Sequence, residues 1–325
     1  MLKRILFGIM SADIRKRHFL RLTFQNQKLL SDWGNTVRVL FVVGNNTYDT
    51  RNDQLRVPVE DVITRELFSS SQSSIGIIKH MHFLLYAVLQ KEDIFTIGDD
   101  DTFTNIPILC HISNHIANSY DYFYAGLMEW YNWRPATFQA TGWGYGPISA
   151  TYYGKLFHNC TANFKSDCVG PIPFFKGPMK LMSKSAAISL VKSDIFVRDF
   201  KLLHQRIIRH TNIFDDVYIG YLFSTLQKLT YIVISPELWL EKRNKIPYNQ
   251  TDCNMLCAHR LPKKCWHNAT FCRKSHLNIH TTKHKPFIRE AKLNTNHKVS
   301  VLTIHNSSSN NKFVCTPSQS GFYAK

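Results

Sequence analysis

The chain has 325 residues, of which 44% are hydrophobic, so it can bury a sizeable core and wholesale disorder is excluded. No apolar run approaches the roughly 18 residues that a membrane-crossing helix needs, which excludes an integral membrane protein for the sequence as it stands. With 40 Lys and Arg against 23 Asp and Glu, the net charge of +17 favours anionic partners: nucleotides, nucleic acid or an anionic membrane surface.

Apolar patterning in the first hundred residues predicts strands that alternate with helices. Apolar runs predict strands at 4–10, 37–43 and 93–97, and helical spacing predicts helices at 14–24 and 75–90. Such alternation is typical of an α/β fold with a mostly parallel sheet flanked by helices, in which ligands bind where the strands end.

The second half of the chain is patterned more weakly. Residues 120–175 are rich in aromatics and glycine with little periodicity, and we expect long loops over a pocket there. We expect a strand that turns into a helix over 179–191, and another helix over 214–226.

The positive charge is concentrated towards the C-terminal end. From Thr251 onward there are 12 Lys and Arg but only 2 Asp and Glu. We therefore divide the chain into an α/β domain at 1–249 and a basic, Cys- and His-rich extension at 250–325, which we expect to be partly disordered. The extension is either a solvated tail that adds solubility or a surface for an anionic partner.

Cysteine and asparagine patterns bear on the compartment. Eight cysteines, four of them clustered at 253, 257, 265 and 272, suit disulfides in an oxidising compartment, with buried thiols as the alternative. Five asparagines fit the N-glycosylation acceptor pattern, a mild enrichment: Asn45, Asn159, Asn249, Asn268 and Asn306. The apolar stretch at 5–10 is too short for a signal peptide. Either the protein is cytosolic or an anchor segment lies upstream.

One stretch of the extension echoes a zinc finger with two cysteines and two histidines. Its members would be Cys265, Cys272, His280 and His284. The cysteines are too far apart, and the spacing from the second cysteine to the first histidine is shorter than the roughly twelve residues expected. Disulfides within the extension are the better interpretation.

Three adjacent aspartates, Asp99, Asp100 and Asp101, follow the strand predicted at 93–97. Adjacent carboxylates repel one another unless a cation or solvent compensates them. Oxygen ligands at this density suit Mg²⁺ or Mn²⁺, which are commonly held by one or two carboxylates plus substrate phosphates. A charged turn is the alternative, but the apolar residues on both sides favour a metal–nucleotide site.

Four landmarks, in order along the chain, carry a resemblance to a known family. They are Ile5-Leu-Phe-Gly-Ile-Met-Ser-Ala with Arg17-His-Phe-Leu-Arg-Leu-Thr-Phe, Val39-Leu-Phe-Val-Val-Gly, Lys79 with Asp99-Asp-Asp-Thr-Phe-Thr-Asn, and Phe214-Asp-Asp-Val-Tyr-Ile-Gly. Together they cover about residues 4 to 225. The chain resembles a divergent member of glycosyltransferase family 31, the β-1,3-galactosyl- and β-1,3-N-acetylglucosaminyltransferases.

The resemblance implies a GT-A fold, a UDP-sugar donor, Mn²⁺ as cofactor and inversion at the anomeric carbon. It implies that Asp101 and Asp99 hold the metal and that Asp216 is the catalytic base. It also implies contacts to the nucleotide-sugar from Arg17, Arg21, Lys79, Asp99, Asp100 and Gly177. The expected reaction moves galactose or N-acetylglucosamine to a glycan acceptor, in β-1,3 linkage, on a glycoprotein or glycolipid. The expected location is the Golgi lumen, as a type II membrane protein whose N-terminal anchor is not in this sequence.

Simple chemistry is consistent with these roles, and each has a structural alternative. An aspartate at the start of a helix beside a sugar pocket can take a hydroxyl proton. Asp215 and Asp216 also fit a helix N-terminus, where the dipole stabilises acids. For Arg17, Arg21 and Lys79, the alternative is solvated charge on a helix surface.

Three departures from the family pattern bear on activity. Phe24 stands where the family has Trp, and Asp215 shortens the first acid of its Glu-Asp-Val motif. In the family's glycine-rich stretch only Gly177 matches, so Lys176 and Pro178 are expected to reshape or partly block the donor pocket. No histidine after the last landmark clearly completes a metal shell.

These departures leave alternatives to an active transferase. One is a catalytically inactive glycosyltransferase-like protein, and another is a basic nucleic-acid-binding protein with a metal-binding tail. Aromatic side chains in the central region are candidates for stacking on an acceptor sugar, or for burial under a loop: Trp130, Tyr131, Trp133, Trp143 and Tyr145.

Overall fold

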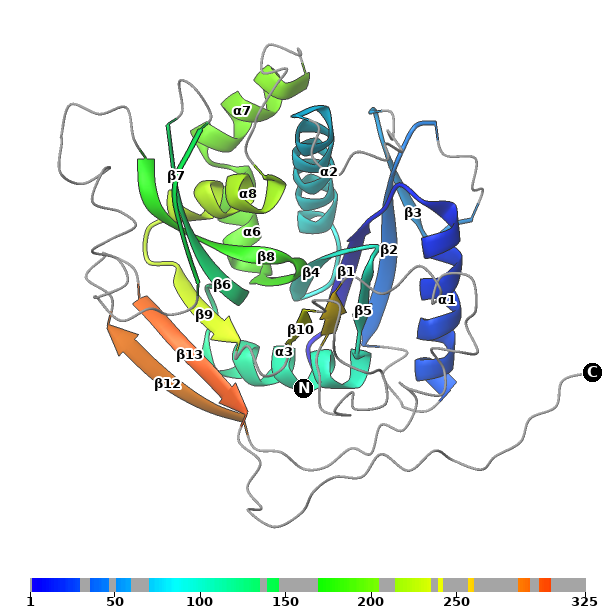
Figure 1. Ribbon diagram of the computed structural model, residues 1–325. Coiled ribbons are helices and arrows are strands. Elements are labelled where there is room, and N and C mark those ends of the chain that lie inside the picture. The colour runs from blue at the N-terminus through cyan, green and yellow to red at the C-terminus, as the bar shows by residue number, and fades with distance from the viewer. Residues whose placement is uncertain are drawn as a thin grey trace, which may run out of the picture.

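The computed structural model describes a mixed α/β protein, shown in Figure 1. The described residues are 2–29, 36–46, 51–59, 70–134, 139–145, 169–204, 214–234, 239–241, 257–259, 286–292 and 298–304. The helices are α1 (Ile14–Leu29), α2 (Ser70–Val88), α3 (Ile106–Ser119), α6 (Lys184–Val191), α7 (Asp194–His204) and α8 (Asp215–Ser224). No helix in this part of the chain is both long and apolar enough to cross a membrane.

The first strands form the parallel half of the main sheet. They are β1 (Ile5–Met10), β2 (Val37–Gly44), β3 (Gln54–Val57) and β4 (Ile94–Asp99). Strand β1 lies between β2 and β4, and β3 pairs with β2, all in parallel register. The strands and helices predicted over this region are confirmed, with boundaries shifted by a few residues.

The later strands continue the same sheet on the other side of β4. They are β6 (Phe123–Arg134), β7 (Gln139–Tyr145), β8 (Val169–Ser183), β9 (Thr230–Ile234), β12 (Pro286–Lys292) and β13 (Lys298–Ile304). The order is β12-β13-β9-β6-β8-β4-β1-β2-β3, with β7 paired to β6. Strand β8 is antiparallel to β4 and β6, whereas β9 is parallel to β6 and to β13. The expected mostly parallel sheet flanked by helices is confirmed.

A small second sheet lies near the carboxyl end of β4. It comprises β5 (Thr102–Thr104), β10 (Trp239–Glu241) and β11 (Cys257–His259). Strand β11 pairs in parallel with β10 and antiparallel with β5, which directly follows the aspartate triplet.

Helices cover both faces of the main sheet, because its strands are apolar on both sides. Successive residues of β1 point to opposite faces: Leu6 and Met10 pack with α2, α6, α7 and α8, while Ile5, Phe7 and Ile9 pack with α1 and α3. Figure 1 shows α2, α6, α7 and α8 gathered on one side of the sheet and α1 apart from them. This two-sided burial explains why the sequence shows continuous apolar runs.

The expectation of long loops over 120–175 is wrong for the described residues of that region. Residues 123–134, 139–145 and 169–183 form strands β6, β7 and β8. Their register slips at bulges, between Gly126 and Met128 and again near Tyr131. Because bulges shift the side-chain alternation, a period-two pattern is not visible in the sequence there.

The predicted boundary at 249/250 stays a prediction, but strands beyond it join the sheets. Strand β13 hydrogen-bonds to β9, and β12 and β13 form one edge of the main sheet, seen at the lower left of Figure 1. The zinc-finger-like stretch lies outside the described residues, as do most of the clustered cysteines and Asn159, Asn249, Asn268 and Asn306.

Candidate functional site

Two of the sequence landmarks meet at the carboxyl end of β4. Asp99 is the last residue of β4, and Asp216 lies in the first turn of α8. Strand β8 runs beside β4 and contributes Gly177 and Lys180, the latter in register with Ile97. Residues far apart in the sequence are therefore brought together where a ligand is expected to bind to a sheet of this kind.

Gly177 lies where two carboxylates converge. Its N–H donates a 2.6 Å hydrogen bond to Asp216 Oδ2. A Cβ at this position would collide with Asp99 Oδ2 and lie 3.1 Å from Asp216 Oδ2. The glycine therefore allows both acids to crowd against the backbone of β8, while its predicted contact to the nucleotide-sugar stays a prediction.

Lys180 brings a positive charge into this acidic group. Its side chain is 0% exposed, and its Nζ lies 2.6 Å from Asp216 Oδ1. Burial opposes the charge of the ammonium, but the carboxylates of Asp216, Asp99 and Asp215 outweigh it and raise the pKa of Lys180. The lysine is therefore charged.

His80, from α2, closes the group from above the sheet. It is fully buried, and its Nδ1 donates to Gly76 O at 2.7 Å, which leaves Nε2 to accept from Lys180 at 3.4 Å. Burial, together with the charge of Lys180, lowers the pKa of His80 to about 3, so the imidazole is neutral at pH 7.

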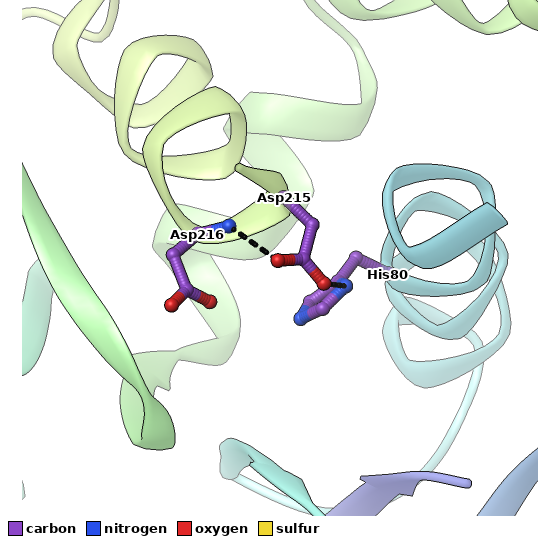
Figure 2. A group of neighbouring side chains, drawn as sticks. All are labelled: His80, Asp215 and Asp216. Carbon is purple, nitrogen blue, oxygen red and sulfur yellow. Dashed lines mark hydrogen bonds and ion pairs between the residues drawn. The ribbon is translucent and has the colours of Figure 1, made fainter. Parts of the chain in front are cut away.

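The two acids of α8 point in different directions. Figure 2 shows Asp215 directed at His80, with Asp216 turned away from them. Asp215 Oδ2 lies 3.6 Å from His80 Nδ1, and Asp215 Oδ1 accepts the backbone N–H of Asp216. Phe214 is the N-cap residue and makes no side-chain cap, so Asp215 contributes to capping while Asp216 reaches β8.

Asp99 is an acid with a strongly raised pKa. Burial, and then the neighbouring charge of Asp216, raise its pKa well above the usual value, although Lys180 counteracts them. Asp101 is half-buried and adds to the same rise. Perturbed acids of this kind mark functional sites more often than surface turns.

Asp100 has a structural role that differs from the roles of its two neighbours, Asp99 and Asp101. Its Oδ2 accepts from Ser11 Oγ at 2.8 Å and from the N–H groups of Ala12 and Asp13, and its Oδ1 pairs with Lys16 at 2.8 Å. The middle aspartate thus ties the end of β1 to the start of α1. Its predicted contact to the nucleotide stays a prediction.

The three basic residues predicted at the nucleotide hold contacts within the protein. Arg17 Nη1 donates to Ser11 Oγ, and Lys79 Nζ donates to Ser11 O at 2.8 Å; both side chains are buried. Arg21 forms two 2.7 Å hydrogen bonds with Asp53 and lies over the ring of Phe41. None of the three is solvated surface charge, and their predicted contacts to the nucleotide stay predictions.

Of the two residues expected to reshape or partly block the donor pocket, Lys176 and Pro178, the structure describes the side chain of Lys176 only. Lys176 turns to Glu129, a buried acid on β6, with Nζ 3.0 Å from its carboxylate.

Among the aromatic residues proposed to stack on an acceptor sugar, Tyr131 is buried in the core, which fits the alternative of an aromatic buried in the protein. The side chains of Trp130, Trp133, Trp143, Tyr145 and Pro178 lie outside the described part of the structure.

The donor groups suit a hard divalent ion. Ligand atoms of His80, Asp215 and Asp216 lie within 4.8 Å of one another, and Asp99 and Asp101 add carboxylates beside them. Oxygen ligands with one imidazole fit Mn²⁺ chemically. The residues therefore fit the metal that the resemblance implies, although Lys180 already lies against one of these acids.

Sequence reasoning missed Lys180 and His80. The sequence Met179-Lys-Leu-Met carries one signal for Lys180. Alternation along a strand places Lys180 on the same sheet face as Met182, whereas Met179 and Leu181 lie on the other face. A polar residue on a strand face that is otherwise apolar indicates a buried partner.

Comparisons with known proteins give only weak likenesses to solved structures. No protein-family model matches the chain, and no curated protein matches its sequence. A glycosyltransferase involved in glycosylation of the major capsid of PBCV-1 is 12% identical, with a TM-score of 0.40, over 79% of this chain and 92% of that one. The galactosyltransferase LgtC, solved with donor and acceptor sugar analogues, is 9% identical, with a TM-score of 0.34, over 80% and 87%. Likeness at this level carries no argument about chemistry.

Proposed function

We propose that the protein transfers a sugar from a nucleotide-sugar to a hydroxyl group of an acceptor. The observation that carries the proposal is the convergence of Asp99 and Asp216 on Gly177. The ordered landmarks that resemble glycosyltransferase family 31 support it, because two of them supply the aspartates that meet there. On this proposal the fold is of the GT-A type.

Asp216 is the proposed general base. The acceptor oxygen attacks the anomeric carbon as the bond from that carbon to the diphosphate breaks, and Asp216 takes the hydroxyl proton. Lys180 and the N–H of Gly177 each hold one of its oxygens, so the carboxylate is fixed in place while lone pairs remain to accept a proton. Attack from the face opposite the leaving group inverts the anomeric centre.

The leaving diphosphate needs positive charge. We propose Asp101 and Asp99 as the residues that would hold Mn²⁺, which would neutralise the charge developing on the diphosphate. Arg17, Lys79 and Asp100 are proposed to act on the nucleotide side, through the contacts that order the end of β1 and the start of α1. Arg21, which pairs with Asp53, is proposed to act on the same side.

The finer parts of the proposal come from the resemblance. They are UDP as the nucleotide, galactose or N-acetylglucosamine as the sugar, a β-1,3 linkage, and a glycan of a glycoprotein or glycolipid as acceptor. A position in the Golgi lumen, through an N-terminal membrane anchor, belongs with them.

A screen of UDP-sugars with and without Mn²⁺ tests the proposal. We expect hydrolysis or transfer by the wild type, and a loss of at least a hundredfold in Asp216→Asn, because the base is removed. Asp194→Asn is the matched control, since Asp194 also lies in the first turn of a helix but is exposed. Full activity of Asp216→Asn, or no turnover of any UDP-sugar, would contradict the proposal.

One observation favours a second candidate, a nucleotide-sugar-binding protein without turnover. Both oxygens of Asp216 are already engaged, by a buried ammonium and by a backbone N–H. On this alternative the protein binds UDP but consumes no UDP-sugar, so a binding titration beside the turnover screen separates the two candidates.

A further inference from the structure

Lys180 is a buried charge whose effect extends beyond holding Asp216. It lies on the face of β8 that α2 and α8 cover, with no exposed surface. Taking an ammonium out of water is unfavourable unless anionic partners compensate for the lost hydration. In this site the compensation comes from several carboxylates rather than from one.

Acidic side chains outnumber basic ones around Lys180. Asp216 is in direct contact, and Asp99 and Asp215 are close enough to favour the charged form of Lys180. Asp101 acts on Asp99 in turn. A pocket with more acids than cations attracts a cation, and Lys180 supplies one from within the chain.

The Lys180 ammonium also contacts ligand atoms that a metal ion would use. Among the residues that the structure describes, His80, Asp215 and Asp216 have ligand atoms close enough to share an ion, beside the Asp99 and Asp101 that are proposed to hold Mn²⁺. Lys180 contacts two of them: Asp216 Oδ1 at 2.6 Å and His80 Nε2 at 3.4 Å. A divalent ion bound to the same atoms would lie against the ammonium and be repelled by it.

We propose that Lys180 is the resident counter-cation of this pocket and that it keeps the affinity of the nucleotide-free protein for divalent cations low. Lys180 is a positioning residue, acting through Asp216 and Asp99. The inference deepens the proposed function and rests on it for the part that the metal plays in transfer. The affinity for the metal alone is measured without any nucleotide-sugar.

Substitution of Lys180 by methionine tests the inference, because methionine keeps an unbranched apolar side chain without charge. Binding of Mn²⁺ alone would be measured at pH 8, without nucleotide, by the electron paramagnetic resonance signal of free Mn²⁺. We expect Lys180→Met to bind Mn²⁺ at least tenfold more tightly than the wild type. Lys184→Met is the matched control, because it removes an equal charge from a lysine whose Nζ donates to Gln90 O, away from the acids.

Each outcome decides the matter. A gain in Lys180→Met no larger than in Lys184→Met overturns the inference. If Lys180→Met is unfolded on its own, recovery of the folded circular-dichroism spectrum on adding Mn²⁺ supports the inference, and failure to recover overturns it. The double variant Lys180→Met with Asp216→Asn removes both charges, and we expect it to show no gain in affinity; an equal gain there also overturns the inference.

Failure of the inference and failure of the proposed function give different results. Tighter Mn²⁺ binding in Lys180→Met, with no turnover of any UDP-sugar by the wild type, contradicts only the proposed function. Turnover of a UDP-sugar by the wild type, with no gain in Mn²⁺ affinity in the variant, contradicts only the inference.

Discussion

At the scale of single residues, the site depends on how closely side chains approach a bare backbone. Gly177 has no Cβ, and the space that a Cβ would fill holds the carboxylates of Asp99 and Asp216. Lys180, on the same strand, then pairs with Asp216. One small residue and one charged residue on β8 thus set the positions of two acids from other elements.

Gly177→Ala tests this arrangement. The added methyl group would displace Asp99 and push against Asp216, so we expect a loss of about 1–3 kcal/mol in the free energy of unfolding and at least a tenfold weaker affinity for UDP. Gly220→Ala is the control, because a Cβ there meets Phe174 and not the acids. Both variants should be less stable in chemical denaturation. Unchanged UDP affinity in folded Gly177→Ala would show that the acids do not line the nucleotide pocket.

At the scale of elements, α2 connects the site to the rest of its face of the sheet. On one side it contributes His80, which lies beside Asp215, and Lys79, whose Nζ donates to Ser11 O. Two residues along the helix from His80, His82 Nε2 lies 2.7 Å from His204 Nε2 at the end of α7, and both rings contact Phe200. Only one proton can lie between the two nitrogens, so at least one of the two imidazoles must be neutral for the contact to form.

The contact between α2 and α7 contributes to the pH dependence of stability, in addition to the buried His80. Burial, and then the neighbouring His204, lower the pKa of His82 from 6.5 to about 4. The unfolded chain therefore binds a proton more readily, and the stabilisation is complete above about pH 6.5 and lost as the pH falls towards 4. We expect the free energy of unfolding to rise with pH over that window by well under 1.4 kcal/mol per pH unit, since solvent screens the half-buried ring.

His82→Phe should reduce that rise to the part that His80 contributes, whereas His18→Asn, on the exposed side of α1, should leave it unchanged. Urea denaturation at a series of pH values measures both variants. An unchanged slope in His82→Phe would mean that the pair with His204 does not form in solution.

At the scale of the whole molecule, the sheet ends in strands from the basic extension. Strand β13 pairs with β9, and β12 pairs with β13, so the edge of the sheet comes from residues beyond the predicted domain boundary. Without them β9 would expose a row of unpaired backbone groups next to the core.

Truncation after residue 249 tests the part played by these strands. We expect the shortened protein to melt several degrees lower than the full chain and to associate through the exposed β9 edge. Thermal denaturation and size-exclusion chromatography measure the two effects. A shortened protein that stays monomeric with an unchanged melting temperature would instead favour an independent domain at 1–249.

Much of this architecture could be predicted from the sequence, for identifiable reasons. Strands such as Val37–Gly44 are buried on both faces, so their apolar runs stand out, and α2 carries a long apolar stripe. The strand that turns into a helix over 179–191 was predicted and matches the end of β8 and α6, but β6 and the earlier part of β8 could not be predicted, because register shifts break their alternation. Of the site, the positions of Asp99 and Asp216 followed from motifs, but the partners Lys180 and His80 depend on which strand and helix lie beside them.

The contacts of Asp100 have a consequence for how triple-aspartate motifs are interpreted. The Asp100 side chain accepts hydrogen bonds from Ser11, Ala12 and Asp13, and so it orders the N-terminal strand and helix. This structural role does not depend on whether the protein transfers a sugar. Selection for a stable protein would preserve this aspartate even in a descendant that had lost catalysis. Among homologues, the middle aspartate of the motif is therefore a poor indicator of activity, and the two outer aspartates are better indicators.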